Sequence, residues 1–447
     1  MGFVEKPRFS CMLGGALATI NALPRVAPIV HASQGCGGNL YMAAFSGSGY
    51  FGSGYCGGNS APSSSIIERD IVFGGEERLA EQIEATLELM DADLFIVLSS
   101  CMTEIIGDHV KGVTERFHKN AYGAPILAVE TAGFAANSYE GYGKVFEGLF
   151  ESYIDPVPQK DPRLLNIFGV IPSYDPFFRG ELEEIRRILG RLGIKANTFF
   201  TNGQTVEDIR SAGAASLNLN LSSVYFAEGL ERIRVSHGIP HAALEMPVGA
   251  QATERFIADV SALMDVPPET GDAVAADEAR RYYAYMDRAL DLYADADFQQ
   301  YGIVVSNANR AIPYARYLIE EIGWIGEYVF VTDDLDEAQR DRLSAEFQKA
   351  SFPAEPRLVF ETGTDRIMKR FFEDRPQFVK DRYFDAFSPA FILGSSLERE
   401  FAQAINAGLL SVSFPVTNRL IMHRGYAGYN GGLALFEDIV GTLVGPR

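Results

Sequence analysis

The chain has 447 residues, of which 47% are hydrophobic and 22% charged, a composition typical of a globular protein with two or three domains. Its formal net charge of −20 argues against nucleic acid and membrane surfaces as partners, because both attract a basic face. No apolar run reaches the roughly 18 residues that a membrane span needs, and no secretory signal opens the chain, so we expect a cytoplasmic protein.

The cysteines are unevenly distributed along the chain. All four, Cys11, Cys36, Cys56 and Cys101, lie in its first quarter. Disulfide bonds are rare in the cytoplasm, and cysteines that only filled a core would be scattered. Their clustering therefore favours metal or redox chemistry.

The first part of the chain alternates predicted helices and strands. We expect, in order, a helix over 11–21, a strand over 26–31, a helix over 76–90, a strand over 94–98, a helix from about Thr103 and a strand over 124–129. This alternation predicts a parallel sheet with crossover helices. The glycine-rich segment 47–58 lacks the Gly-Lys-Ser/Thr ending of a nucleotide-binding loop, so it predicts no ATP site.

Two further units with the same alternation follow. In the second we expect strands over 166–171, 195–200 and 217–221 and helices over 180–192, 225–236 and 254–264, with a helical link over 265–297. In the third we expect strands over 301–305, 327–331, 357–361 and 390–394 and a helix over 311–322. The sequence therefore predicts an α/β fold of three consecutive doubly wound, Rossmann-like domains with parallel sheets, over residues 1–160, 161–297 and 298–447.

The positions of three cysteines indicate a metal cluster. Cys36 and Cys101 lie just past predicted strands, and ligands of doubly wound sheets bind outside the carboxyl ends of strands. Cys11 and Cys101 also open helices, where the helix dipole lowers a thiol pKa and favours the thiolate that ligates iron. A simple four-iron cluster needs four cysteines, so either Cys56 is the fourth ligand or a partner subunit completes the cluster across an interface.

Several motifs add a family resemblance over nearly the whole chain. The segments 11–16 (Cys-Met-Leu-Gly-Gly-Ala), 28–36 (ending Gln-Gly-Cys), 71–75 (Ile-Val-Phe-Gly-Gly) and 99–108 (Ser-Ser-Cys-Met-Thr-Glu-Ile-Ile-Gly-Asp) resemble the β-type subunit of nitrogenase and its relatives. The segments 238–254, 393–398 and 425–432 are similar to the second and third domains of that family.

The resemblance implies a specific role for the three cysteines. Cys11, Cys36 and Cys101 would bind an iron–sulfur relay cluster, of the eight-iron P-cluster type or a four-iron type, shared with an α-type subunit in an α2β2 heterotetramer. An ATP-dependent iron-protein reductase would supply electrons, and the catalytic cofactor would lie in the α-type subunit, so no catalytic residue is expected here. Gly133 stands where the family's β-type subunit can carry a serine ligand, and Cys56 has no counterpart.

Several alternatives remain at this point. Within the family, the departures and the glycine-rich segment favour the methylthio-alkane reductases, which cleave carbon–sulfur bonds, over a dinitrogen-reducing nitrogenase; protochlorophyllide reductases fit less well. A cofactor-assembly scaffold is a second class, although such paralogues often lose relay cysteines. A non-metal α/β binding protein with incidental cysteines is a third. His31 is expected to orient the Cys36 turn, and His423 to be structural.

Overall fold

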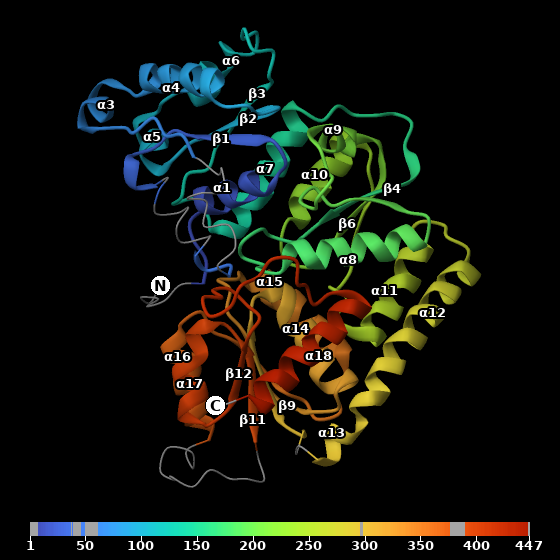
Figure 1. Cartoon of the computed structure of the whole chain (residues 1–447). Helices are drawn as coiled ribbons and strands as arrows, with labels where there is room; N and C mark the ends of the chain where they lie inside the picture. Colours follow the sequence, from blue (N-terminus) through green and yellow to red (C-terminus); the bar gives the residue numbers. More distant parts are fainter. Residues whose placement is uncertain are drawn as a thin grey trace.

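The computed structural model describes residues 8–36, 38, 46–49, 61–295, 298–375 and 389–445. Within these residues the strands form three separate sheets, and each strand pairs in parallel with its neighbours. Helices pack on each sheet, and the three helix–sheet units follow one another along the sequence (Figure 1). The predicted α/β fold with parallel sheets is therefore confirmed.

The first sheet carries the cysteine-bearing segments. Its order is β1 (Val26–Val30), β2 (Leu94–Leu98) and β3 (Ile126–Val129). Every residue of β1 and β2 is buried because helices cover both faces of the sheet, and this explains their unbroken apolar sequences. The helices of this unit are α1 (Met12–Ala22), α3 (Glu68–Phe73), α4 (Glu76–Leu89), α5 (Cys101–Ile106), α6 (Val110–Glu115) and α7 (Ser138–Ser152).

The second sheet has the order β5 (Lys195–Asn197), β4 (Asp161–Phe168), β6 (Ala215–Asn220) and β7 (His241–Ala243). Strand β4 begins earlier than predicted because residues 161–163 are polar or proline and are not buried, so they carry no hydrophobic signal. The helices of this unit are α8 (Phe178–Arg191), α9 (Val206–Arg210), α10 (Ala227–His237) and α11 (Gly249–Leu263), followed by the linking helices α12 (Pro268–Met286) and α13 (Leu290–Asp295).

The third sheet has five strands. Their order is β10 (Arg357–Phe360), β9 (Ile325–Val331), β8 (Tyr301–Ser306), β11 (Ala390–Gly394) and β12 (Gly408–Ser411). The helices of this unit are α14 (Ala308–Arg316), α15 (Glu337–Ala350), α16 (Thr364–Asp374), α17 (Arg399–Ala404) and α18 (Gly428–Val444). Helix α18 packs on α8, α11 and α12 as well as on β12, so it joins the second and third units (Figure 1).

The three units meet around one buried carboxylate. Asp333, which follows β9, accepts hydrogen bonds from the hydroxyls of Tyr139 in α7 and Tyr225 before α10. The two tyrosine rings stack with their centroids 4.4 Å apart. One cluster of buried apolar side chains also runs through all three units. The predicted domain boundaries at residues 160 and 297 therefore fall within one continuous core, and they remain a prediction.

No helix in the described part of the chain is both long and apolar enough to span a bilayer.

Candidate metal centre

The structure brings Cys11, Cys36 and Cys101 to the carboxyl edge of the first sheet. Cys36 lies in the turn after β1, and Cys101 is the first residue of α5, directly after β2. Cys11 precedes α1, but its backbone bridges to Asn137, in the connection that leads from β3 to α7. The edge is reached from three separate stretches of sequence, because parallel strands end at the same side of a sheet.

Gly133 shows how close two of the thiols are. A Cβ atom added at Gly133 would lie 3.1 Å from the Sγ of Cys11 and 3.1 Å from the Sγ of Cys101. The two sulfurs therefore flank this glycine and are separated by at most twice that distance. A side chain at position 133 would therefore crowd both thiols, and at least one of them would have to shift to admit it.

The third thiol belongs to the same cluster of side chains. Burial raises the pKa of the Cys11 thiol, and Coulombic repulsion with the nearby Cys101 and Cys36 raises it further. The backbone N–H groups of Gly14 and Leu13 lower that pKa but do not outweigh burial and the neighbouring thiols. The prediction that the helix start lowers the pKa is therefore wrong in net direction for Cys11.

The donor set fits an iron–sulfur cluster better than a single metal ion. Among the described residues, no three His, Cys, Asp or Glu side chains converge closely enough to hold one ion. Thiolates around a multi-iron cluster are spaced more widely than the tetrahedral ligands of zinc. All three cysteines are only partly buried. The chemistry of the three thiols fits such a cluster.

Hydrogen bonds between strand ends hold this edge in place. The backbone N–H of Thr131 donates to the Oγ of Ser99 at 2.8 Å, and the hydroxyl of Thr131 donates to the Ser99 carbonyl at 2.7 Å. These bonds join the end of β2, which leads to Cys101, to the end of β3, which leads to Gly133. The hydroxyl of Ser33 lies 3.7 Å from the Sγ of Cys36, within reach of a weak hydrogen bond to sulfur.

His31 lies between β1 and the Cys36 turn, and both of its ring nitrogens have partners. Its Nε2 lies 3.0 Å from a carboxylate oxygen of Asp108, and its Nδ1 lies 2.9 Å from the Oγ of Ser64. The other Asp108 oxygen accepts the backbone N–H of Gly75 at 2.9 Å. Burial lowers the pKa of His31, although the Asp108 carboxylate opposes this shift. Both ring nitrogens are engaged by Ser64 and Asp108, and the role of His31 in orienting the turn remains a prediction.

Sequence reasoning did not assign roles to Asp108 and Ser64. The sequence signal for Asp108 was its position directly after Gly107, at the end of the cysteine-bearing segment 99–108. Cys56 lies outside the described residues. His237 contacts the Ile154 carbonyl and His241 contacts Glu231, and neither contact involves a cysteine.

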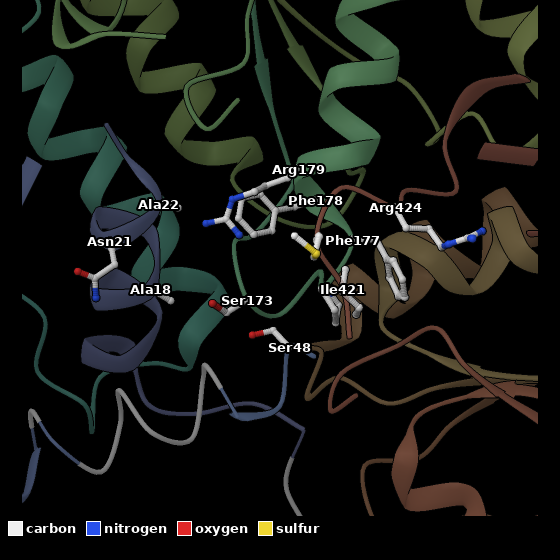
Figure 2. A pocket seen from close by; sticks show the side chains of 12 residues that line it. Ala18, Asn21, Ala22, Ser48, Ser173, Phe177, Phe178, Arg179, Ile421 and Arg424 are labelled. Carbon is white, nitrogen blue, oxygen red and sulfur yellow. The ribbon is translucent and has the colours of Figure 1, made fainter. Parts of the chain in front are cut away.

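A small cavity between the units contains no cysteine or histidine. It holds about 20 Å³, room for roughly one water molecule, and lies where α1, the start of α8 and the loop before α18 meet (Figure 2). Arg179 lies over the Phe178 ring at its wall, with its guanidinium carbon 4.5 Å from the ring centroid. The cavity is too small and lacks the soft ligands for a second cluster, so the cysteine edge is the stronger candidate.

An exposed apolar patch adjoins the cysteine edge. Helix α5 carries Cys101 at its start and Ile105, 73% exposed, one turn later. Helix α3, which packs against α5, exposes Val72 by 73% and Phe73 by 82%. We call Ile105, Val72 and Phe73, together with the half-exposed Ile67 and Ile71, the α3–α5 patch. Adjacent exposed apolar side chains of this kind are typical of protein interaction sites.

Comparisons with known proteins cover almost the whole chain. Residues 11–444 match the family model described as Nitrogenase component 1 type Oxidoreductase. The beta chain of a nitrogenase molybdenum-iron protein from Sinorhizobium fredii is 25% identical over 472 residues, covering 98% of this chain and 84% of that protein. One subunit of the light-independent protochlorophyllide reductase of Heliobacterium modesticaldum is 23% identical, covering 96% of this chain and 77% of that protein.

A solved structure shares the fold. The structure described as "Nitrogenase Cp1 at pH 6.5" superposes with a TM-score of 0.77 at 17% identity and covers 99% of this chain and 94% of that one. The fold and the family matches together define this protein as an oxidoreductase subunit. The chain belongs to the nitrogenase component 1 type oxidoreductase family, as a β-type subunit of nitrogenase-like reductases. The family predicted from the sequence motifs is confirmed.

Proposed function

We propose that this chain is the electron-relay subunit of a nitrogenase-like reductase, in which Cys11, Cys36 and Cys101 hold half of an iron–sulfur cluster. The observation that carries the proposal is the pair of sulfurs flanking Gly133 at a partly exposed sheet edge. A bound cluster would store and pass on electrons, while the chain orients the thiolates and keeps one side of them buried. The residues themselves perform no acid–base chemistry on a substrate.

The partial exposure of the three cysteines supports a partner that completes the cluster. Three thiolates are fewer than a four-iron cluster needs, and an eight-iron P-cluster needs more still. A groove of about 550 Å³ runs beside the same edge, lined among others by Met12, Ala132 and Phe134. Phe134 is 66% exposed directly after Gly133, as expected for a side chain that a partner covers. We assign this side to an α-type catalytic subunit, in an α2β2 assembly.

The α3–α5 patch supports a second partner. Phe73 and Ile105 belong to a group of neighbouring exposed apolar side chains, and α5 connects this patch directly to Cys101. A reductase docked there would deliver electrons close to the relay. We assign the patch to an ATP-dependent iron-protein reductase.

For the reaction of the complex we propose reductive cleavage of methylthio-alkanes, with dinitrogen reduction as the alternative. The cleavage consumes two electrons and two protons and converts R–S–CH3 into R–H and CH3SH. The absence of a side chain at Gly133, between the two thiols, supports a relay site built differently from that of nitrogenases with a serine ligand. Gas analysis of the purified complex with its reductase distinguishes methanethiol from ammonia as the product.

The test of the relay role is the loss of iron after single substitutions. We expect Cys36→Ala and Cys101→Ala, each expressed with the α-type partner, to lose the shared cluster signal and electron transfer, because too few thiolates remain. Ser236→Ala, on the far helix α10, is the matched control and should retain both. Wild-type iron content and reduction kinetics in either cysteine variant would refute the proposal.

The same preparations distinguish an enzyme subunit from a cofactor-assembly scaffold. A relay cluster stays with the protein through repeated turnover, whereas a scaffold passes its cluster to another protein. We therefore expect the iron content per complex to be unchanged after turnover and repurification. Transfer of the iron to an added apo-protein would instead assign the scaffold role.

A further inference from the structure

The segment that carries Cys11 is anchored in the third unit by a buried arginine. Its segment lies beside the third unit (Figure 1), and Arg8 is 1% exposed. The Nη1 of Arg8 donates to the Oγ of Ser395 at 2.8 Å and to an oxygen of Glu398 at 3.0 Å. Its Nη2 donates to the other Glu398 oxygen and to the Oγ1 of Thr364 at 3.2 Å. Glu398 is also 1% exposed, so the guanidinium and carboxylate form a buried, two-pronged pair.

The pair is built into the third sheet. Glu398 closes a short turn that follows β11, where it also accepts the backbone N–H of Ser395 at 2.7 Å. A Cβ atom at Gly394 would lie 2.8 Å from the Glu398 carboxylate, so the glycine leaves the space that this carboxylate occupies. Contacts within the third unit therefore fix the position of the carboxylate that accepts from Arg8.

Only Phe9 and Ser10 separate this anchor from Cys11, and Ser10 is held as well. Its carbonyl accepts the backbone N–H of Ser138 at 2.8 Å, and its hydroxyl contacts that of Tyr174. On the other side of the cysteine, the N–H of Met12 donates to the Ala136 carbonyl at 3.0 Å. Two intervening residues are too few to absorb a displacement at Arg8. Such a displacement therefore reaches the backbone of Cys11.

A buried ion pair is a weak explanation for stability alone. Desolvation of two charges offsets most of their attraction, and apolar side chains of similar size often replace such a pair without loss. What the pair does provide is geometry, because a planar guanidinium held at both oxygens fixes position and orientation. Its location beside a metal-ligand candidate makes that geometry useful.

We infer that Arg8 is a positioning residue for Cys11, and that the Arg8–Glu398 pair couples the third unit to the thiol edge of the first. The inference rests on the proposed function, since the thiol is positioned for the cluster. It predicts that loss of the pair disturbs Cys11 selectively and leaves Cys101, which is carried by β2 and α5, in place.

The first test measures thiol reactivity in the iron-free, full-length chain. Iodoacetamide labelling at fixed pH, read by peptide mass spectrometry, gives the rates for Cys11 and Cys101 in the same sample. In Arg8→Met we expect the Cys11 rate to rise about tenfold relative to Cys101, because local opening exposes the thiol. Arg8→Lys keeps the positive charge but loses the planar guanidinium that binds both carboxylate oxygens. It should give a smaller rise in the Cys11 labelling rate.

Two further variants keep this test decisive. The double variant Arg8→Met/Glu398→Leu removes both charges, so it folds even if a single unpaired charge prevents folding, and it should show the same selective rise. Arg187→Met removes an ion pair between α8 and α12 and should leave the ratio of the two rates unchanged. An unchanged ratio in the double variant, or an equal rise at both cysteines, would overturn the inference.

The second test uses the iron-loaded complex with its α-type partner. We expect Arg8→Lys to shift the midpoint potential and the paramagnetic resonance spectrum of the cluster at unchanged iron content, which a purely structural loss would not do. If the complex contains no iron in any variant, the proposed function fails while the labelling result still stands. Unchanged potential and spectrum with normal iron content would contradict the positioning role.

Discussion

The carboxylate at the junction of the three units gives the most quantitative prediction. Asp333 is 1% exposed and accepts three hydrogen bonds: from the hydroxyls of Tyr139 and Tyr225 and from the backbone N–H of Ala308. Burial nevertheless raises its pKa from 3.8 to about 6, and the negative charge of Asp175 adds to the shift. The substitution Asp333→Asn removes the titration and keeps the size of the side chain.

The size of the effect follows from the pKa shift. Each pKa unit corresponds to about 1.4 kcal/mol, so a shift of about two units is worth about 3 kcal/mol between the two protonation states. The folded protein holds the proton more tightly than the unfolded chain. The contribution of Asp333 to the free energy of unfolding is therefore fully present below its unfolded pKa of 3.8 and is lost as the pH rises through about 6.

Urea unfolding of the full-length, iron-free protein measures this contribution. Other carboxylates also titrate, so the quantity to follow is the difference in unfolding free energy between wild type and Asp333→Asn. From about pH 5.5 to about pH 7.5 we expect this difference to shift against the wild type by about 1 kcal/mol. A constant offset from the altered hydrogen bonds is expected and does not affect the slope. A difference that stays flat over this range would refute the reasoning.

Three further substitutions test the metal centre and its surface. Gly133→Ala should lower the iron content of the complex, because its Cβ would lie 3.1 Å from the sulfurs of Cys11 and Cys101, whereas Gly190→Ala, which meets nothing within 4 Å, should retain it. Cys56→Ala should leave the iron count unchanged, since three thiols already converge without it; loss of iron would make Cys56 a ligand. Phe73→Ser should slow electron transfer from the reductase, whereas Leu89→Ser, equally exposed at 82% on α4, should not; equal effects would remove the docking role of the patch.

Local sequence was sufficient for the elements around the centre. Strand β2 coincides with the predicted range because Leu94–Leu98 is an unbroken apolar run, and such a run is needed when both faces of a strand are covered. The turn with Cys101 follows at once, so its place at the carboxyl edge was also predictable. The motifs around these elements were specific enough to indicate the family.

Weak local signals explain the elements that were not predicted. Helix α18 contains several glycines, which are poor helix formers in isolation. In the fold, a Cβ atom at Gly432 would lie 2.7 Å from the Cα of Gly249, so the small residue allows a close approach of α18 to α11. The helix is therefore stabilised by tertiary packing that no window of sequence contains.

The sequence by itself determined the family, the parallel α/β units and the thiols available for a cluster. Only the tertiary structure decided how these thiols are arranged. It brought Cys11 beside Cys101 through the pairing of its segment with Asn137, and it reversed the expected pKa shift of Cys11. It also tied that segment to Glu398 through Arg8. Such contacts join residues far apart in the chain, and their energies depend on burial and distance, which composition and spacing do not encode.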